Sequence, residues 1–138
     1  MMMIVIDTNI IFAILGRIDS KYADAVLSGN HEIFCSTFLF VELFKHKERI
    51  LKKSKLNEDD LLLQLHVILN SIKIVPVREV STASYYKAFR ICRHVDVKDI
   101  DFIALALEKK AMLWTKDKPI ITAIQQSGII ELFTPQPF

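Results

Sequence analysis

Acidic residues follow two of the most apolar short runs in this chain. Ile4-Val5-Ile6 leads directly into Asp7, and Met112-Leu113-Trp114 is followed by Asp117 three positions later. Unbroken apolar runs predict strands that are buried on both faces, as in a parallel sheet. Open α/β sheets bind ligands at the carboxyl ends of their strands, so we expect both acids at one edge. Asp7 could be a ligand for a cation that offsets its burial, or simply the N-cap of the next helix.

Further acids lie close to predicted helix starts. Glu42 is part of an apolar stretch, and Asp96, Asp99 and Asp101 come just before the small apolar run 102–107. Carboxylates that converge raise one another's pKa unless a cation lies between them. Mg²⁺ and Mn²⁺ prefer such oxygen ligands, and a bound water can then become the hydroxide that hydrolyses a phosphodiester. The pattern indicates a divalent-metal site built from carboxylates.

Other catalytic arrangements are missing from the sequence. It has no Cys/His spacing typical of zinc sites, no glycine-rich phosphate loop and no Gly-x-Ser-x-Gly nucleophile elbow. Glu42 and His46 are four residues apart and could form a metal pair on one helix face. No second His or Cys lies nearby to support that pair.

The segment from Lys45 to Lys55 is the most basic part of the chain. It carries six cations and is opposed only by Glu48: Lys45, Lys47, Arg49, Lys52, Lys53 and Lys55. One interpretation is a solvated helix end, and the other is a patch that contacts phosphates. The net charge of only +2 argues against a protein that coats nucleic acid through bulk charge, but it allows a local patch.

The remaining pattern predicts the elements that position these residues. Strands are expected at 4–6, 32–36, 73–77 and 111–114, with a last one at 129–133. Helices are expected at 9–15, from Ser20 to Leu27, from Thr37 onward with an apolar stripe of Leu39, Phe40, Leu43 and Phe44, at 58–71, from Ser81 to Cys92, at 102–107 and at 119–126. This alternation predicts a three-layer α/β/α sandwich around a central, mostly parallel sheet of four to five strands. Pro76 indicates that the 73–77 strand ends at an edge.

The totals predict one domain over residues 1–138, with a hydrophobic fraction of 51% that can form a substantial core. Cys35 and Cys92 have apolar neighbours and are expected to be reduced core residues. The apolar start of the chain is too short for a signal peptide, and no run is long enough to span a membrane. We therefore expect a cytoplasmic protein.

Four segments, in this order, resemble PIN-domain proteins. They are Ile6-Asp7-Thr8-Asn9, Ser36 through Glu42-Leu43, Asp96-Val-Lys-Asp99 leading into Phe102-Ile-Ala-Leu-Ala-Leu, and Leu113-Trp-Thr-Lys-Asp117. Together they cover nearly the whole chain, although none is decisive alone. The long 58–71 helix and the Leu-Trp-Thr-Lys-Asp-Lys segment look most like a prokaryotic PIN-domain branch that is related to the VapC-type toxins, and they look less like those toxins themselves.

The resemblance implies a role for each matched residue. It assigns the four acids of the family to Asp7, Glu42, Asp99 and Asp117. Asp96 is a plausible additional ligand, and the choice among Asp96, Asp99 and Asp101 for the third acid stays open. Thr8, Asn9 and Thr115 match polar positions that hydrogen-bond the acidic cluster.

The function that the resemblance implies is a Mg²⁺- or Mn²⁺-dependent endoribonuclease. Five lysines are candidates for holding the RNA backbone: Lys45, Lys47, Lys52, Lys53 and Lys116. Such a protein could be the toxin of a toxin–antitoxin pair, with a small antitoxin as partner and a homodimer as its assembly. The alternatives are a PIN-like module that binds nucleic acid or protein without cutting, and a nuclease that acts on DNA, because nothing in the sequence addresses the 2′-hydroxyl.

Overall fold

The computed structural model describes residues 2–18, 20–93, 95 and 99–135. Its elements follow one another along the chain as β1 (Met3–Ile6), α1 (Thr8–Ile14), α2 (Lys21–Leu27), β2 (Glu32–Ser36), α3 (Phe38–Ser54), α4 (Glu58–Ser71), β3 (Lys73–Val75), the 3₁₀ turn η1 (Val77–Glu79), α5 (Thr82–Cys92), α6 (Ile100–Lys109), β4 (Met112–Trp114) and α7 (Lys118–Ser127). Strands alternate with helices, as the sequence pattern predicts. Asp96, a predicted ligand, lies outside the described residues.

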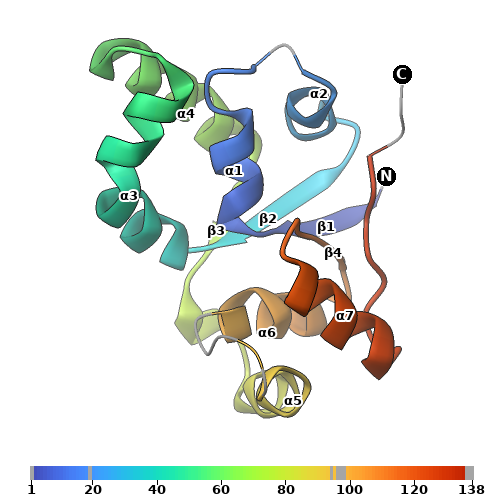
Figure 1. Ribbon diagram of the computed structural model, residues 1–138. Coiled ribbons are helices and arrows are strands. Elements are labelled where there is room, and N and C mark those ends of the chain that lie inside the picture. The colour runs from blue at the N-terminus through green and yellow to red at the C-terminus, as the bar shows by residue number, and fades with distance from the viewer. Residues whose placement is uncertain (1, 19, 94, 96–98, 136–138) are drawn as a thin grey trace.

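The four strands form one parallel sheet in the order β3-β2-β1-β4. β1 and β2 are the inner strands, so each has a neighbouring strand at both of its edges. Ile4, Val5 and Ile6 of β1 are completely buried. Helices α1 to α4 lie on one side of the sheet, and α5, α6 and α7 lie on the other (Figure 1). The predicted α/β/α sandwich is confirmed, and β3 is an edge strand, as expected, but it ends at Val75 and not at residue 77.

Side-chain caps explain where several helices begin. The Ser20 hydroxyl accepts from the backbone N–H of Ala23, the Asn57 side chain accepts from Asp60, and the Ser81 hydroxyl accepts from Ser84. Each cap satisfies one of the backbone donors that the first helical turn leaves without an acceptor. These three starts agree with the sequence prediction.

The predicted apolar stripe on α3 is only partly buried. Leu39 is fully buried, but Phe40 is 47% exposed and Phe44 is 90% exposed. The reason is geometric, because α3 extends past the carboxyl edge of the sheet and has little to pack on besides α1 (Figure 1). An apolar stripe in the sequence therefore does not show by itself which of its side chains are buried.

The predicted last strand at 129–133 is reduced to a single bridge. Leu132 pairs with Leu113 in a parallel bridge. The backbone N–H of Leu113 donates to Glu131 over 2.9 Å, and that of Phe133 donates to Leu113 over 2.8 Å. Cys35 and Cys92 are buried free thiols, as expected. None of the described helices is long and apolar enough to cross a membrane.

Candidate active site

The register between β1 and β4 brings Asp7 to Thr115. Ile6 pairs with Trp114, and the backbone N–H of Asp7 donates to the Trp114 carbonyl over 3.1 Å. The next residue on each strand is therefore Asp7 on one and Thr115 on the other. The Thr115 hydroxyl donates to Asp7 Oδ2 over 2.8 Å, across 108 residues of sequence.

Asp7 is buried, and both of its carboxylate oxygens accept hydrogen bonds. Oδ1 accepts from the Asn9 backbone N–H over 3.2 Å and from the Thr8 hydroxyl over 3.3 Å. The Asn9 bond makes Asp7 the N-cap of α1, so the capping interpretation of Asp7 is confirmed. Burial raises the pKa of this carboxyl, the hydrogen bond from Thr115 opposes that rise, and the nearby charge of Asp117 adds to it.

Asp117 belongs to the same arrangement through Thr115. The Asp117 backbone N–H donates to the Thr115 hydroxyl over 3.1 Å. Its Oδ1 accepts from the Ile120 backbone N–H over 3.2 Å, which makes Asp117 the N-cap of α7. Both strand-borne acids therefore cap helices, and one threonine links them.

On the other flank of β1, β2 ends in a residue to which sequence reasoning gave no role. Val5 pairs with Phe34, so the register continues to Ser36 opposite Asp7. Ser36 is buried, and its hydroxyl accepts from the Phe38 backbone N–H over 3.0 Å. The available signal was a small polar residue at the end of an apolar strand, next to the strand that carries Asp7.

Glu42 is buried on α3 but contacts its own helix. Its Oε2 lies 3.1 Å from His46 Nε2, one helical turn away, in a contact that is an ion pair when His46 is protonated. The His46 ring also meets Phe12 of α1 edge-on, with 6.3 Å between centroids. The predicted proximity of Glu42 and His46 is confirmed as a side-chain contact, and a metal role for the pair stays a hypothesis.

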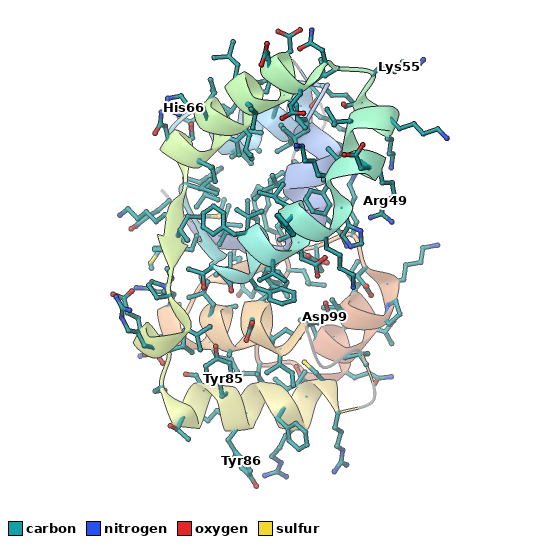
Figure 2. The ribbon with its side chains drawn as sticks, turned by 90° about the vertical axis from the view of Figure 1, so that its left-hand side faces the viewer. Arg49, Lys55, His66, Tyr85, Tyr86 and Asp99 are labelled. Atoms are coloured by element: carbon teal, nitrogen blue, oxygen red, sulfur yellow. The ribbon has the colours of Figure 1, made fainter. Side chains whose placement is uncertain are left out.

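Asp99 and Asp101, at the start of α6, have different neighbours. Asp99 is half-buried at the N-terminus of α6, below α3 in the view of Figure 2. Burial raises the pKa of the Cys92 thiol to about 12, and the charge of Asp99 adds a smaller contribution to that rise. Asp101 accepts a hydrogen bond from the Tyr85 hydroxyl, which points from α5 toward α6. The side chain of Asp101 is therefore turned toward α5.

Comparison with known proteins identifies the family of this chain. A family model described as PIN domain matches residues 5–131, which is most of the chain. The chain belongs to the PIN-domain family. No curated protein matches.

A solved structure shares the PIN-domain fold with this chain. It is the crystal structure of VapBC2 from Rickettsia felis bound to a DNA fragment from their promoter. The match has a TM-score of 0.64 and 17% sequence identity, and it covers 96% of this chain and 98% of the other. At this identity the likeness establishes the fold alone.

The candidate PIN-domain site fits a divalent cation by the chemistry of its donors. Its acids offer hard carboxylate oxygens, the ligands that Mg²⁺ and Mn²⁺ prefer. The described residues contain no group of three acid, His or Cys side chains close enough to hold a metal. Asp7 and Asp117 are the pair that lies together, while Glu42 is turned to His46.

The five lysines predicted to hold nucleic acid occupy different surroundings. Lys53 and Lys116 line a groove beside Asp117 and Asn9. Lys47 forms an ion pair with Glu58 of α4, with 3.1 Å between Nζ and Oε1. Lys45 and Lys52 are exposed on α3 and do not line that groove. Sequence reasoning missed Arg17 and Arg49 as groove residues, since only the three-dimensional position distinguishes Arg49 from the cations around it.

Proposed function

We propose that this PIN-domain chain is a metal-dependent endoribonuclease. Asp7, Glu42, Asp99 and Asp117 hold Mg²⁺ or Mn²⁺, and Asp96 is an additional ligand. The observation that carries this proposal is the state of Asp7. Its side chain is 3% exposed, and no cationic side chain pairs with it in the described part of the chain.

A buried carboxylate without a cation is costly, because burial disfavours the charged form. The hydrogen bonds from Thr8, Thr115 and the Asn9 backbone offset only part of that cost, since the pKa of Asp7 remains raised. A divalent cation between Asp7 and Asp117 would remove their repulsion and favour the ionised form of both. This supports a ligand role in addition to the capping role.

The residues around the acids have positioning roles in the proposal. Thr115 orients Asp7 through its hydroxyl and Asp117 through the backbone, while Thr8 and Asn9 fix the other oxygen of Asp7. A bound Mg²⁺ or Mn²⁺ lowers the pKa of a water so that hydroxide can attack a phosphodiester. Holding the carboxylates rigidly keeps them oriented for that ion.

One observation favours a second function, a PIN-like module that binds nucleic acid or protein without cutting it. Among the described residues, Glu42 is paired with His46 and no three acids form a metal-binding group. If the response to metal does not depend on Glu42, the metal set is incomplete. Metal titration distinguishes the two functions directly.

We further propose that the chain is the toxin of a toxin–antitoxin pair in the cytoplasm, with a small antitoxin as partner and a homodimer as its assembly. The support is the fold shared with the VapBC2 structure and the apolar side chains exposed on α3 and α4. Phe44 is 90% exposed, and Leu63 is 64% exposed. Exposed apolar side chains of this size are typical of surfaces that another protein covers.

The test combines a metal titration with a cleavage assay. Mn²⁺ should raise the melting temperature of the wild type but not that of Asp7→Asn, and labelled RNA should be cut only by the wild type in Mg²⁺ or Mn²⁺. DNA of the same sequence, assayed in parallel, reports whether the 2′-hydroxyl matters. A wild type whose melting temperature ignores both ions contradicts the metal site.

The matched control is Asp59→Asn. Asp59 is an exposed acid in the first turn of α4 and is not part of the site. This variant should keep both the response to Mn²⁺ and the cleavage. Expression of the wild type against Asp99→Asn, with growth and RNA integrity as readouts, tests the toxin role. Equal growth and intact RNA in both cultures would contradict that role while leaving a non-toxic nuclease possible.

A further inference from the structure

Two adjacent tyrosines of α5 point in opposite directions. Tyr85 is half-buried and points toward α6, where its hydroxyl donates to Asp101. Tyr86 is 62% exposed and points away from the molecule (Figure 2). Ala88 and Cys92, three and seven positions after Tyr85, are buried on the same side as Tyr85. This packing fixes which side of α5 meets the solvent.

The solvent side of α5 combines aromatic rings with arginines. Residues three and four apart lie on one face of a helix, so one face, called here the outer face of α5, carries Tyr86, Phe89, Arg90 and Arg93. Phe89 is 51% exposed, and both arginines are exposed. The guanidinium carbon of Arg90 lies 5.9 Å from the centroid of the Tyr86 ring, a distance at which a cation and an aromatic face attract each other.

The charge of α5 has one sign. From Thr82 to its C-cap Arg93 the helix carries three cations, Lys87, Arg90 and Arg93, and no acid. Within the described part of the chain, none of these three cations forms an ion pair with a carboxylate. In a chain of net charge +2, this is a local concentration of positive charge that favours an anionic ligand.

Two acids of α6 contact α5 away from its outer face. Glu108 accepts from the Ser81 backbone N–H over 2.8 Å and from the Ser84 hydroxyl over 2.9 Å, at the start of α5. Asp101 accepts from the Tyr85 hydroxyl on the inner side of the helix. These contacts hold both carboxylates away from the exposed arginines, which keep their full charge for a ligand.

The outer face of α5 is separate from the candidate active site. Helix α5 packs on α6 and α7, on the other side of the sheet from α1 and α3 (Figure 1). None of the residues of the outer face lines the groove beside Asn9 and Asp117. A ligand on this face therefore contacts the chain at a second place.

The chemistry of the outer face favours one kind of occupant. A second copy of the chain, docked by a two-fold axis, would bring Arg90 and Arg93 against the same arginines, and such like charges disfavour association. An acidic peptide would pair with the arginines but offers no flat face to the two rings. A single nucleic-acid strand offers both phosphates for the cations and bases that stack on aromatic rings.

We propose that the outer face of α5 is a second contact surface for single-stranded RNA. Bases stack on Tyr86 and Phe89, which are about one helical turn apart, while Arg90 and Arg93 contact phosphates. The choice of RNA rests on the proposed nuclease function, because the surface would hold a part of the same strand that the acids cut. The contact adds affinity without touching the acids.

The first test removes the rings and keeps the charge. A fluorescent single-stranded RNA of about 12 nucleotides, within the range of single-strand site sizes, is titrated with protein in EDTA over a series of salt concentrations. Tyr86→Leu with Phe89→Leu should weaken binding about tenfold or more and leave the salt dependence unchanged. Tyr86→Phe keeps a ring and is the matched control, so it should bind as the wild type does. Wild-type affinity in the double leucine variant overturns the proposal.

The second test removes the charge and keeps the rings. Arg90→Gln with Arg93→Gln should reduce the slope of log affinity against log salt by about 1.4, since each lost phosphate contact removes about 0.7. The matched control is Arg78→Gln with Lys110→Gln, which changes two exposed cations outside the outer face and should leave the slope as it is. Equal changes in both double variants would mean that bulk charge binds the RNA, which overturns the proposal.

Two further ligands identify the occupant. A duplex RNA of the same length hides its base faces, so the double leucine variant should bind it as well as the wild type does. An equal loss for duplex and single strand would overturn the stacking contact. A peptide of glutamates should bind far more weakly than RNA, and tighter peptide binding that depends on Arg90 would assign the face to an acidic protein instead.

Kinetics separate this inference from the nuclease function on which it rests. With metal present, both α5 double variants should raise KM for RNA and leave kcat nearly unchanged. Cleavage with an unchanged KM in both variants would overturn the α5 surface and leave the nuclease intact. RNA binding in EDTA that depends on Tyr86 and Phe89, in a protein that never cuts, would support the surface and refute only the nuclease.

Discussion

The acids that follow strands and those carried by helices are held in different ways. Asp7 and Asp117 come after β1 and β4, and the hydroxyl of Thr115 joins them. Glu42 lies on α3 and pairs with His46 of its own helix. The sheet register and the hydrogen bonds of Thr115 fix the positions of Asp7 and Asp117. The position of Glu42 depends instead on how α3 packs beyond the sheet.

In the proposed metal site, this difference means that the two strand-borne acids are linked to each other whereas Glu42 is not linked to them. The register between β1 and β4 places Asp7 beside Thr115, and the Thr115 hydroxyl contacts both Asp7 and Asp117. Only Oε2 of Glu42 contacts His46, so in the proposed site the orientation of Glu42 depends on its own helix and not on Asp7. A cation would then complete the site by drawing the helix-borne acids toward the strand-borne ones.

The largest expected effect is the loss of cleavage in Asp7→Asn. Removing the charge of the central carboxylate should lower the cleavage rate on the order of 10³-fold. Glu42→Gln should cost about tenfold less, because Glu42 is not held in place for the metal. Initial rates on labelled RNA at saturating Mn²⁺ measure both. A larger loss in Glu42→Gln would reverse the order and contradict the comparison.

Thr115→Val should destabilise the fold by about 1–3 kcal/mol, because the buried carboxylate of Asp7 loses its shortest hydrogen bond. The Asp117 backbone N–H loses its acceptor in the same variant. Urea denaturation without metal measures the change. Thr115→Ser keeps the hydroxyl and is the matched control, so equal destabilisation by both variants would show that the methyl group matters and not the hydrogen bonds.

The raised pKa of Asp7 predicts a pH-dependent stability difference. Above its raised folded-state pKa the carboxyl is charged and buried, so it lowers stability, and this cost disappears as the pH falls toward the unfolded value of about 4. Without metal, Asp7→Asn should therefore be more stable than the wild type at neutral pH by on the order of 1 kcal/mol, or about 3–5 °C.

That advantage should shrink as the pH is lowered through the raised pKa of Asp7, because the wild-type carboxyl becomes neutral there. Melting temperatures of both proteins, measured in EDTA from pH 4 to pH 8, give the difference directly. A constant difference over this range would mean that the charge of Asp7 costs nothing, which removes the main support for a cation at this position.

The smallest expected effect is that of His46→Gln. The ion pair with Glu42 is partly exposed and spans one turn of one helix, so its loss should change stability by no more than about 0.5 kcal/mol. Urea midpoints measure the change, and cleavage should persist. A loss above about 2 kcal/mol would show that His46 holds α3 on the fold, in which case the helix-borne half is as rigid as the strand-borne half.

The sequence predicts the strand-borne half of the site well, because local signals determine it. An apolar run followed by an acid gives both the strand and its end, and parallel pairing then places Asp7 and Asp117 at one edge. Caps such as Asn57 mark the helix starts through the chemistry of one side chain. The contact between Thr115 and Asp7 depends on register, which no local signal reveals.

The helix-borne half is harder to predict, because packing decides it. Lys47 and Lys53 look alike in the basic segment, but one is paired with Glu58 and the other lines the groove. Phe44 has the spacing of a core residue and is the most exposed large apolar side chain described. Helix rotation and the choice of neighbour are properties of the whole fold.

The short bridge between Leu132 and Leu113 has a consequence for self-association. An open strand edge presents free backbone groups that can pair with another molecule. The two hydrogen bonds from Glu131 to Phe133 occupy the outer side of β4, and Pro76 ends the opposite edge directly after β3. Both borders of this short sheet are thus blunted, so copies of the chain have little opportunity to stack strand against strand into larger aggregates.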